Sequence, residues 1–435
     1  MAAACGLGTT YLVSEYGNLF AFGVNYCNQL GSSTVVTSQV YPLFLRKESM
    51  FQGHGVLCVS AASEHAACIT GDGAVWTWGW GGMGAAYHRR LGHGRDDDGE
   101  TLSAPRFRDP GRLGPEVFDN APAITVVCGR MCTMVLTTTG HVWTCEFHDN
   151  PEVQAMADNR FARIDPAIYE TAIVRIACSS RHMLALNDQG TLFTWDNKID
   201  GQPVKIPRST FGDQGVLQMC GGVNSAVVVT ANGVIWQVCP EMTPQRVGTD
   251  GDFDATDIQS MASYDGYTLV VTCDGRLYGW GRDRYARAPT MCTRATLMPD
   301  AAGFTNDNIA SVCMGFFHRV IVKRDGTVYT WGEAYAYLTI SFPNPVPLGL
   351  GYSLDEAPHY LGSGRCCNDT TQHTPRRLAL ARLCGQRIGS CSESPWMQRY
   401  CAAHLALGMQ SHRQLAEGSY LRTCQVDVGS RHVED

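Results

Sequence analysis

The segment Asp325-Gly326-Thr327-Val328-Tyr329-Thr330-Trp331-Gly332 contains the pattern that decides the fold. Its first glycine is preceded by an aliphatic residue at −4 and followed by an aliphatic at +2 and an aromatic at +3. The same register surrounds six other glycines, spaced 42 to 67 residues apart. Repetition at such intervals is typical of repeat architectures. The seven anchors are Gly17, Gly73, Gly140, Gly190, Gly233, Gly275 and Gly326.

Each repeat predicts a β-hairpin. A β-branched run such as residues 227–229 predicts a short buried strand, and a pair such as Asp325-Gly326 predicts a tight two-residue turn. A further strand is expected ahead of each hairpin, as at residues 309–312, except in the first repeat, which begins at Cys5. Such units cannot bury both faces alone, so they must pack together. We expect an all-β fold, a seven-bladed β-propeller of about 50-residue repeats.

Several repeats resemble those of the regulator of chromosome condensation family. The resemblance lies in Cys5-Gly6 through Gly23, in Gln29-Leu30-Gly31, and in the Trp-Gly pairs Trp78-Gly79 and Trp331-Gly332. It covers roughly residues 1–394 and is specific in repeats one, two, six and seven. In repeats three, four and five the Trp-Gly pair is replaced, which leaves the hairpin pattern intact. The resemblance implies a seven-bladed propeller and, as in the founding member, guanine-nucleotide exchange or chromatin binding.

Composition agrees with one large β domain inside the cell. The 435-residue chain has 46 glycines, 44 % hydrophobic residues and a net charge of −7. No apolar stretch is long enough to span a bilayer, and Met1–Cys5 does not look like a secretory signal. We therefore expect an intracellular protein, cytoplasmic or nuclear, whose 19 cysteines are mainly reduced and several of which serve as small buried hydrophobes.

The C-terminal part is expected to close the ring. Residues 387–392 are similar to the strand at residues 175–179, so we predict that they supply the strand missing from the first blade. Residues 425–432 are the alternative closing strand. Ser394-Pro395 is a favourable helix start, and apolar residues at helical spacing continue to Gly418. The expected division is a propeller over residues 1–394 and a helix and tail over 395–435.

No catalytic or cofactor-binding motif stands out in the sequence. His65, His182 and His318 share one slot of the repeat, which favours hydrogen bonding or packing over catalysis. Two groups of possible metal ligands lack the usual spacing for calcium or zinc, so no cofactor is expected. These groups are Asp250, Asp252, Asp254 and Asp257, and the C-terminal Cys366, Cys367, His373, Cys384, Cys391, Cys401 and His404.

Two long connections depart most from the repeat and are the candidate partner-binding segments. Insertions on a rigid repeat scaffold commonly form its recognition surface. The first spans residues 80–120 and the second residues 333–374. The candidate contact residues are His88, Arg89, Arg90, Arg95, Asp96, Asp97 and Asp98 in the first, and Tyr335, Tyr337 and Tyr352 in the second.

Three functions are compatible with these observations. A rigid disc with variable loops favours a non-enzymatic scaffold for protein partners. The family resemblance implies nucleotide exchange on a small GTPase as the alternative, and exchange needs no covalent chemistry. Histone binding is a third hypothesis, since an acidic patch attracts basic proteins. Direct DNA binding is not expected at a net charge of −7, and the sequence leaves the oligomeric state open.

Overall fold

The computed structural model of this protein describes most of the repeat region. The described residues are 2–32, 38–80, 88–93, 109–130, 132–146, 160–179, 182–196, 202–223, 225–238, 244–249, 251, 253–282, 291–300, 304–316, 318–332 and 342–347. The predicted C-terminal helix and both candidate closing strands lie outside these ranges, as does the cysteine and histidine group beyond residue 365.

Strands make up nearly all of the regular structure. In chain order they are β1 (Ala2–Cys5), β2 (Thr9–Val13), β3 (Leu19–Val24), β4 (Ser38–Leu45), β5 (Val56–Ala61), β6 (His65–Thr70), β7 (Val75–Gly79), β8 (Gly111–Leu113), β9 (Ala123–Cys128), β10 (Cys132–Thr137), β11 (Val142–Glu146), β12 (Ala162–Arg163), β13 (Ile173–Cys178), β14 (His182–Asn187), β15 (Leu192–Asp196), β16 (Val204–Lys205), β17 (Val216–Gly221), β18 (Ala226–Thr230), β19 (Ile235–Val238), β20 (Gln245–Thr249), β21 (Ile258–Tyr264), β22 (Tyr267–Thr272), β23 (Leu277–Arg282), β24 (Met291–Leu297), β25 (Ile309–Met314), β26 (His318–Lys323), β27 (Val328–Gly332) and β28 (Phe342–Pro347).

The helices are single turns in the connections. They are α1 (Lys47–Met50) and the 3-10 helices η1 (His88–Leu91), η2 (Pro115–Phe118), η3 (Pro166–Tyr169), η4 (Arg208–Phe211) and η5 (Ala255–Asp257). Proline at the first helical position starts η2 and η3, because its fixed φ suits a helix start. Asp165 caps η3 by accepting a hydrogen bond from the backbone N–H of Ala167 at 3.0 Å.

Each repeat contributes four strands that pair antiparallel in chain order. Among the described residues, five sheets have four strands and one has eight. The larger sheet forms because β20 and β24, the outer strands of two consecutive repeats, pair in parallel through Gly248 with Arg294 and Thr249 with Ala295. Residues 342–347, inside the second candidate loop, form β28 and pair with β27 as the fourth strand of their repeat.

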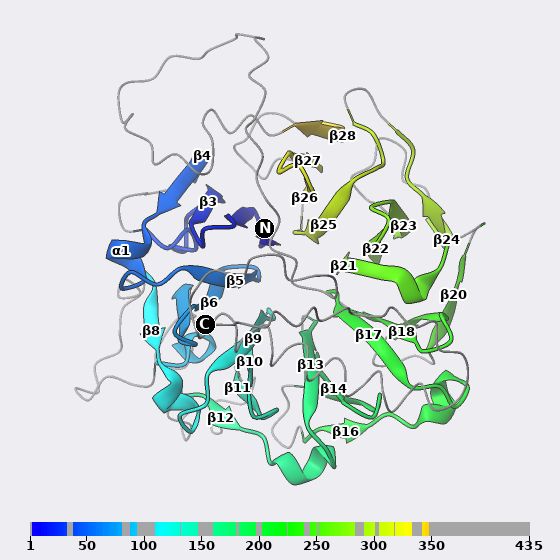
Figure 1. The fold of residues 1–435 in the computed structure, drawn as a ribbon, viewed down its shortest axis with the longest axis horizontal. Helices are drawn as coiled ribbons and strands as arrows, with labels where there is room; N and C mark the ends of the chain where they lie inside the picture. The colour runs from blue at the N-terminus through cyan, green and yellow to red at the C-terminus, as the bar shows by residue number, and fades with distance from the viewer. Residues whose placement is uncertain are drawn as a thin grey trace, which may run out of the picture.

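The repeats are arranged in a ring, with the first strand of each toward the centre (Figure 1). The neighbours β1, β5 and β9 are in contact in that order, followed by β13, β17, β21 and β25. β25 also contacts β1, so the last described repeat lies beside the first. The fold is therefore an all-β, propeller-like ring, as the repeat pattern predicted.

The first repeat has its own inner strand, contrary to the expectation from the sequence. β1 pairs antiparallel with β2, from Ala2 opposite Val13 to Cys5 opposite Thr10. This strand occupies the position that residues 387–392 were expected to fill. This strand is hard to predict from the sequence, because Ala2–Cys5 is short and carries none of the β-branched residues that mark the other inner strands.

The hairpin turns contain three residues, not the predicted two. In the second repeat the N–H of Thr70 donates to the carbonyl of Ala74 at 3.0 Å, and the N–H of Gly73 donates to the carbonyl of Thr70 at 2.8 Å. Only the glycine has a positive φ, +78°, whereas Asp72 does not. The three-residue loop is therefore a β-turn followed by a residue in the left-handed backbone conformation, here Gly73. The aspartate has another role, since its Oδ1 accepts a hydrogen bond from the Thr70 hydroxyl at 2.6 Å.

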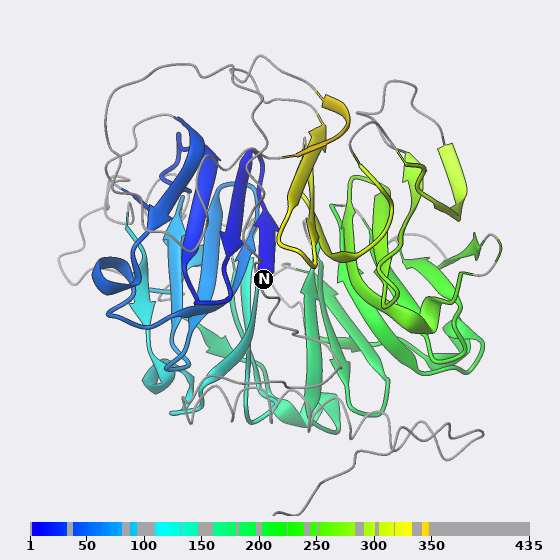
Figure 2. The same cartoon turned by 45° about the horizontal axis from the view of Figure 1, so that its top comes forward.

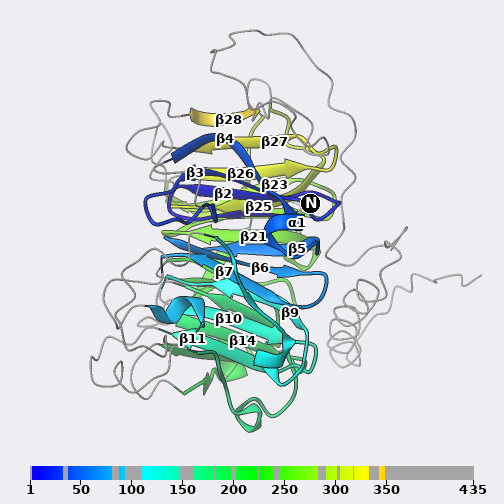
Figure 3. The ribbon, with the colours of Figure 1, turned by 90° about the vertical axis from the view of Figure 1, so that its left-hand side faces the viewer.

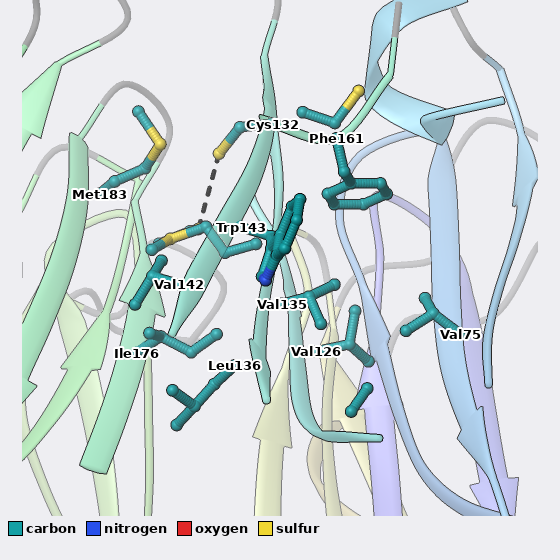
Figure 4. Packing of buried hydrophobic residues seen from close by; sticks show 14 of the residues in the cluster. Val75, Val126, Cys132, Val135, Leu136, Val142, Trp143, Phe161, Ile176 and Met183 are labelled. Atoms are coloured by element: carbon teal, nitrogen blue, oxygen red, sulfur yellow. Dashed lines mark hydrogen bonds between the residues drawn. The ribbon is translucent and has the colours of Figure 1, made fainter. Parts of the chain in front are cut away.

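Aromatic pairs tie most repeats to the connection that precedes them. In six repeats the aromatic at +3 from the anchor glycine packs against an aromatic of that connection, with ring centroids 4.5 to 5.8 Å apart. In the first repeat, Phe20 stacks on Phe44 of β4 instead. Each such pair adds about 0.5–1.5 kcal/mol to the burial of apolar area. Figure 4 shows Trp143 and Phe161 among aliphatic side chains such as Val126 and Val135.

Candidate interaction face

The two ends of the strands form two different faces of the ring. The hairpin turns that hold the anchor glycines lie on one of them, the turn face, together with the connections between repeats. The other, the insertion face, holds the connections from first to second strand and from third to fourth strand of each repeat. Figure 2 shows the strands of each repeat side by side between these ends. In Figure 3, α1 lies at the right-hand turn face and the light-blue η1 at the left-hand insertion face.

On the turn face, the hairpin turns and the connections between repeats are similar from one repeat to the next. The carbonyl of an anchor glycine accepts a hydrogen bond from the first strand of the next repeat, as Gly17 does from the N–H of Val56 at 2.8 Å and Gly275 from that of Ile309 at 3.0 Å. The insertion face is irregular, because its third-to-fourth-strand connections differ greatly in length. It is the face on which the sequence of this chain departs most from the repeat.

The middle of the first candidate loop is anchored to the insertion face. The Thr77 hydroxyl of β7 donates to the carbonyl of Leu91 at 2.8 Å, and its oxygen lies 2.9 Å from Nε2 of His93. The Thr133 hydroxyl of β10 donates to the carbonyl of Arg90 at 2.6 Å. Residues 88–93 are therefore held by two consecutive repeats.

Arg90 is the buried centre of this anchor, with 6 % of its surface exposed. Its Nη1 donates to the carbonyl of Arg130 at 2.8 Å and lies 3.7 Å from Oε2 of Glu64, while its guanidinium covers the ring of Trp80. Burial lowers the pKa of Arg90 and raises that of Glu64. The attraction between the two charges shifts each pKa in the opposite direction, but by less. Burial and the Glu64 charge also raise the pKa of Cys27 to about 11.

The structure places only part of the predicted contact set. His88, Arg89 and Arg90 lie in η1, and the contacts of Arg90 show that its side chain holds the loop on the ring. Arg95, Asp96, Asp97, Asp98, Tyr335, Tyr337 and Tyr352 lie outside the described residues. Partner binding by this set stays a prediction.

Two residues of the histidine slot, His65 and His318, form hydrogen bonds to neighbouring repeats. Nε2 of His65 lies 3.0 Å from Oγ1 of Thr133, and Nε2 of His318 lies 2.8 Å from Oγ1 of Thr10. Because the Thr133 hydroxyl donates to the carbonyl of Arg90, its oxygen accepts a hydrogen bond from Nε2–H of His65. Burial lowers the pKa of His65 to about 3 and that of His318 to about 4. These are structural hydrogen bonds between repeats.

The Gln29-Leu30-Gly31 motif has a clear structural role. The carbonyl of Gln29 accepts hydrogen bonds from the Tyr11 hydroxyl and from Nε1 of Trp78, the latter at 2.8 Å. Trp78 belongs to the next repeat, so the motif fastens the connection after β3 to two repeats. Asn25 lies four residues before Gln29, and its Oδ1 accepts a hydrogen bond from the N–H of Leu30 at 2.8 Å. This bond shapes the same connection.

Sequence reasoning missed several residues of the anchor. Glu64, Arg130 and His93 were not singled out, because each depends on contacts between connections far apart in the chain. A signal existed for Glu64 alone, since it directly precedes a residue of the histidine slot. Burial lowers the pKa of His93 to about 4, so it is a neutral, structural side chain at physiological pH.

No group of three or more possible metal ligands occurs in the part of the chain that the structure describes. Of the four aspartates considered for calcium, Asp254 caps η5 by accepting from the N–H of Thr256 at 2.8 Å. Asp257 ends that helix, and Asp250 and Asp252 lie outside the described residues. Among the helices described, none is long and apolar enough to cross a membrane.

Comparison with known proteins agrees with this geometry. No family model matches the chain. It is 26 % identical over 291 residues to the "RCC1 domain-containing protein RUG3, mitochondrial" of Arabidopsis thaliana, covering 54 % of this chain and 63 % of RUG3. Its relatives are RCC1-domain proteins. A second relative is the "Secretion-regulating guanine nucleotide exchange factor" of Mus musculus. It is 24 % identical over 331 residues, covering 74 % of this chain and 61 % of that protein.

Solved RCC1-type propellers share the fold. Prp20p of Saccharomyces cerevisiae, a yeast RCC1, superposes with a TM-score of 0.58 at 18 % identity, covering 75 % of this chain and 85 % of that one. The Prp20p structure is described together with its binding to Gsp1p and histones. The present chain spans less than two thirds of the length of RUG3 and of the mouse exchange factor.

Proposed function

We propose that this chain is an intracellular, non-enzymatic protein-interaction scaffold built on a seven-bladed RCC1-type propeller. Counting the eight-stranded sheet as two blades supports the number, and the contact of β25 with β1 supports closure of the ring. In this proposal the partner binds the insertion face at the first blade.

One observation carries the proposal: the segments that follow β7 and β27, the second of them residues 333–341, leave the ring from the same face, on either side of the first blade. The first loop follows β7 of the second repeat, and the second follows β27 of the last. Because β1 lies between β5 and β25, these repeats flank the first. The connection after β3 lies between them and presents Tyr26, which is 50 % exposed. Aromatic residues at the centre of a surface are frequent hot spots of protein interfaces.

The first blade offers a matched pair of variants for a test. Tyr26 lies on the insertion face, and Tyr16, 59 % exposed, lies in the hairpin turn on the opposite face. With the full chain immobilised in a native cell extract, we expect Tyr26→Ser to reduce recovery of the principal partner about tenfold or more, a loss of about 1.4 kcal/mol. Tyr16→Ser should retain it. Loss in Tyr16→Ser with retention in Tyr26→Ser would contradict the proposed face.

The two loops are tested by variants that leave the anchor at residues 88–93 unchanged. Replacing residues 94–108 by a short Gly-Ser linker leaves η1 and β8 intact, whereas a deletion from 84 to 112 would also remove the anchor at residues 88–93. Asp96→Asn, Asp97→Asn and Asp98→Asn together test the acidic cluster, with Glu15→Gln, Glu48→Gln and Glu116→Gln on the turn face as the charge-matched control. Tyr335→Ser with Tyr337→Ser tests the second loop. We expect both sets of loop variants, but not the control, to weaken capture.

Guanine-nucleotide exchange on a small GTPase is the second candidate, favoured by the mouse relative named for that activity. An exchange factor binds the nucleotide-free GTPase most tightly. Capture is therefore run with EDTA and, in parallel, with excess magnesium and GTP. A GTPase retained only with EDTA, whose release of fluorescent GDP this chain accelerates, would establish exchange and overturn the scaffold proposal. A partner retained equally in both conditions supports the scaffold.

A further inference from the structure

The joint between the last and the first repeat differs from the others. Successive repeats elsewhere are joined by a connection of eight to eleven residues, but β25 and β1 come together across almost the whole described chain. Non-covalent contacts hold this joint, among them the hydrogen bond between His318 and Thr10. An apolar cluster that includes Leu12, Phe20 and Val320 lies in the same place.

Two cysteines face one another inside this joint. Sγ of Cys5, at the end of β1, lies 2.9 Å from Sγ of Cys313 in β25, and the two residues are 308 positions apart. Both are free thiols, 7 % and 8 % exposed. A disulfide requires about 2.05 Å between the sulfurs, so a small shift of either side chain brings them to bonding distance.

We propose that Cys5 and Cys313 are an oxidation site, at which a disulfide closes the propeller ring covalently. The proposal concerns the joint itself and does not depend on the partner. A disulfide stabilises mainly by restricting the unfolded chain, and more so for a longer closed loop. No other pair of thiols that the described residues bring together spans a comparable length of sequence.

Hydrogen peroxide is an oxidant small enough for a buried pair. One cysteine attacks as thiolate, forming a sulfenic acid with loss of water after protonation of the leaving oxygen. The second thiol then attacks that sulfur, the S–S bond forms, and a second water leaves. In sum, two thiols and one peroxide give one disulfide and two waters, so two electrons pass from sulfur to oxygen. Burial and the neighbouring Cys313 raise the pKa of Cys5, so we expect the reaction to be slower than at an exposed cysteine.

The chain contains a matched thiol pair. Sγ of Cys132 and Sγ of Cys178 lie 3.5 Å apart, 46 positions from one another, between two consecutive repeats that a connection already joins (Figure 4, dashed line). A bond there would close a much shorter loop than the bond between Cys5 and Cys313. Cys132→Ser is therefore a control that removes a buried thiol and leaves the ring joint intact.

The test oxidises the reduced full chain with hydrogen peroxide and reads two signals. Mass spectrometry of peptides, after free thiols are blocked, is expected to show Cys5 linked to Cys313. The melting temperature should rise by about 5 °C or more and return after dithiothreitol. Cys132→Ser should keep the reversible rise, and Cys313→Ser should lose it.

Two results would overturn the proposal. One is the absence of the linked peptide after an oxidation continued well beyond the time at which the exposed Cys273 is fully oxidised, since the buried pair reacts more slowly than that thiol. The other is a linked peptide without any rise in melting temperature, which would show that the bond does not close a joint that opens on unfolding. Both readouts come from the unaltered chain, so they hold even if a variant does not fold.

Discussion

At the scale of single residues, the anchor glycines combine two constraints. Each has a positive φ, which costs a residue with a side chain about 1–2 kcal/mol. Some also lie against the next repeat. A Cβ at Gly275 would meet the backbone nitrogen of Ile309 at 2.9 Å and Cα of Asn308 at 3.0 Å, whereas at Gly233 its closest neighbour would be a methyl group of Thr256 at 3.4 Å. The glycine pattern therefore reports turn conformation and close packing together.

Gly275→Ala is accordingly expected to destabilise the protein more than Gly233→Ala, although their φ angles are similar, 87° and 76°. Strain alone accounts for about 1–2 kcal/mol in both, and the backbone clash adds roughly 1–3 kcal/mol at Gly275. Urea unfolding measures the difference. Gly251→Ala, at φ 57° with open space around it, serves as the control for strain alone. Equal losses at Gly275 and Gly233 would show that packing between repeats tolerates the added methyl group.

At the scale of elements, buried neutral histidines connect adjacent sheets. Burial, and then the charge of Arg319, lowers the pKa of His318 from the ordinary 6.5 to about 4. The unfolded chain therefore binds more protons than the folded one between about pH 6.5 and pH 4. The contribution of His318 to stability is complete above pH 6.5 and decreases as the pH falls toward 4. His65, with a pKa of about 3, acts in the same direction.

His318→Gln is expected to flatten this pH dependence. The Gln amide can keep a hydrogen bond to Thr10 and does not titrate, so the loss of stability between pH 6.5 and pH 4 should shrink by about 1.4 kcal/mol for each pKa unit removed. Unfolding by urea at a series of pH values measures it. His318→Ala is the comparison, with lower stability at every pH because the bond is lost. An unchanged slope in His318→Gln would mean that His318 does not titrate with folding.

At the scale of the whole molecule, β1 completes the first repeat and brings it against the last. A chain lacking residues 2–5 leaves β2 paired only with β3 and opens the joint with β25. We expect a marked fall in melting temperature or the loss of a single cooperative transition, measured by calorimetry. A chain lacking residues 387–435 should melt like the full chain, since β1 already occupies the inner position. If instead the chain lacking residues 387–435 melted at a lower temperature and the chain lacking residues 2–5 did not, residues 387–392 would be favoured as the closing strand.

The sequence alone determined the repeat, the all-β class and the resemblance to RCC1 proteins. These follow from local chemistry: a glycine at the turn, aliphatic residues on the strands, and an aromatic three residues later. It also located the two long connections, because they interrupt the pattern. The recurrence of the histidine slot favoured hydrogen bonding or packing over catalysis, but did not identify the partners in the neighbouring repeats.

Tertiary structure alone decided what depends on contacts between distant residues. It assigned the inner position of the first repeat to the short β1, lengthened the turns to three residues, and made Arg90 an anchor with Glu64 and Arg130. It also brought Cys5 and Cys313 together. The physical reason is that local preferences act over a few residues, whereas closing a ring depends on which surfaces meet after the chain has turned through every repeat.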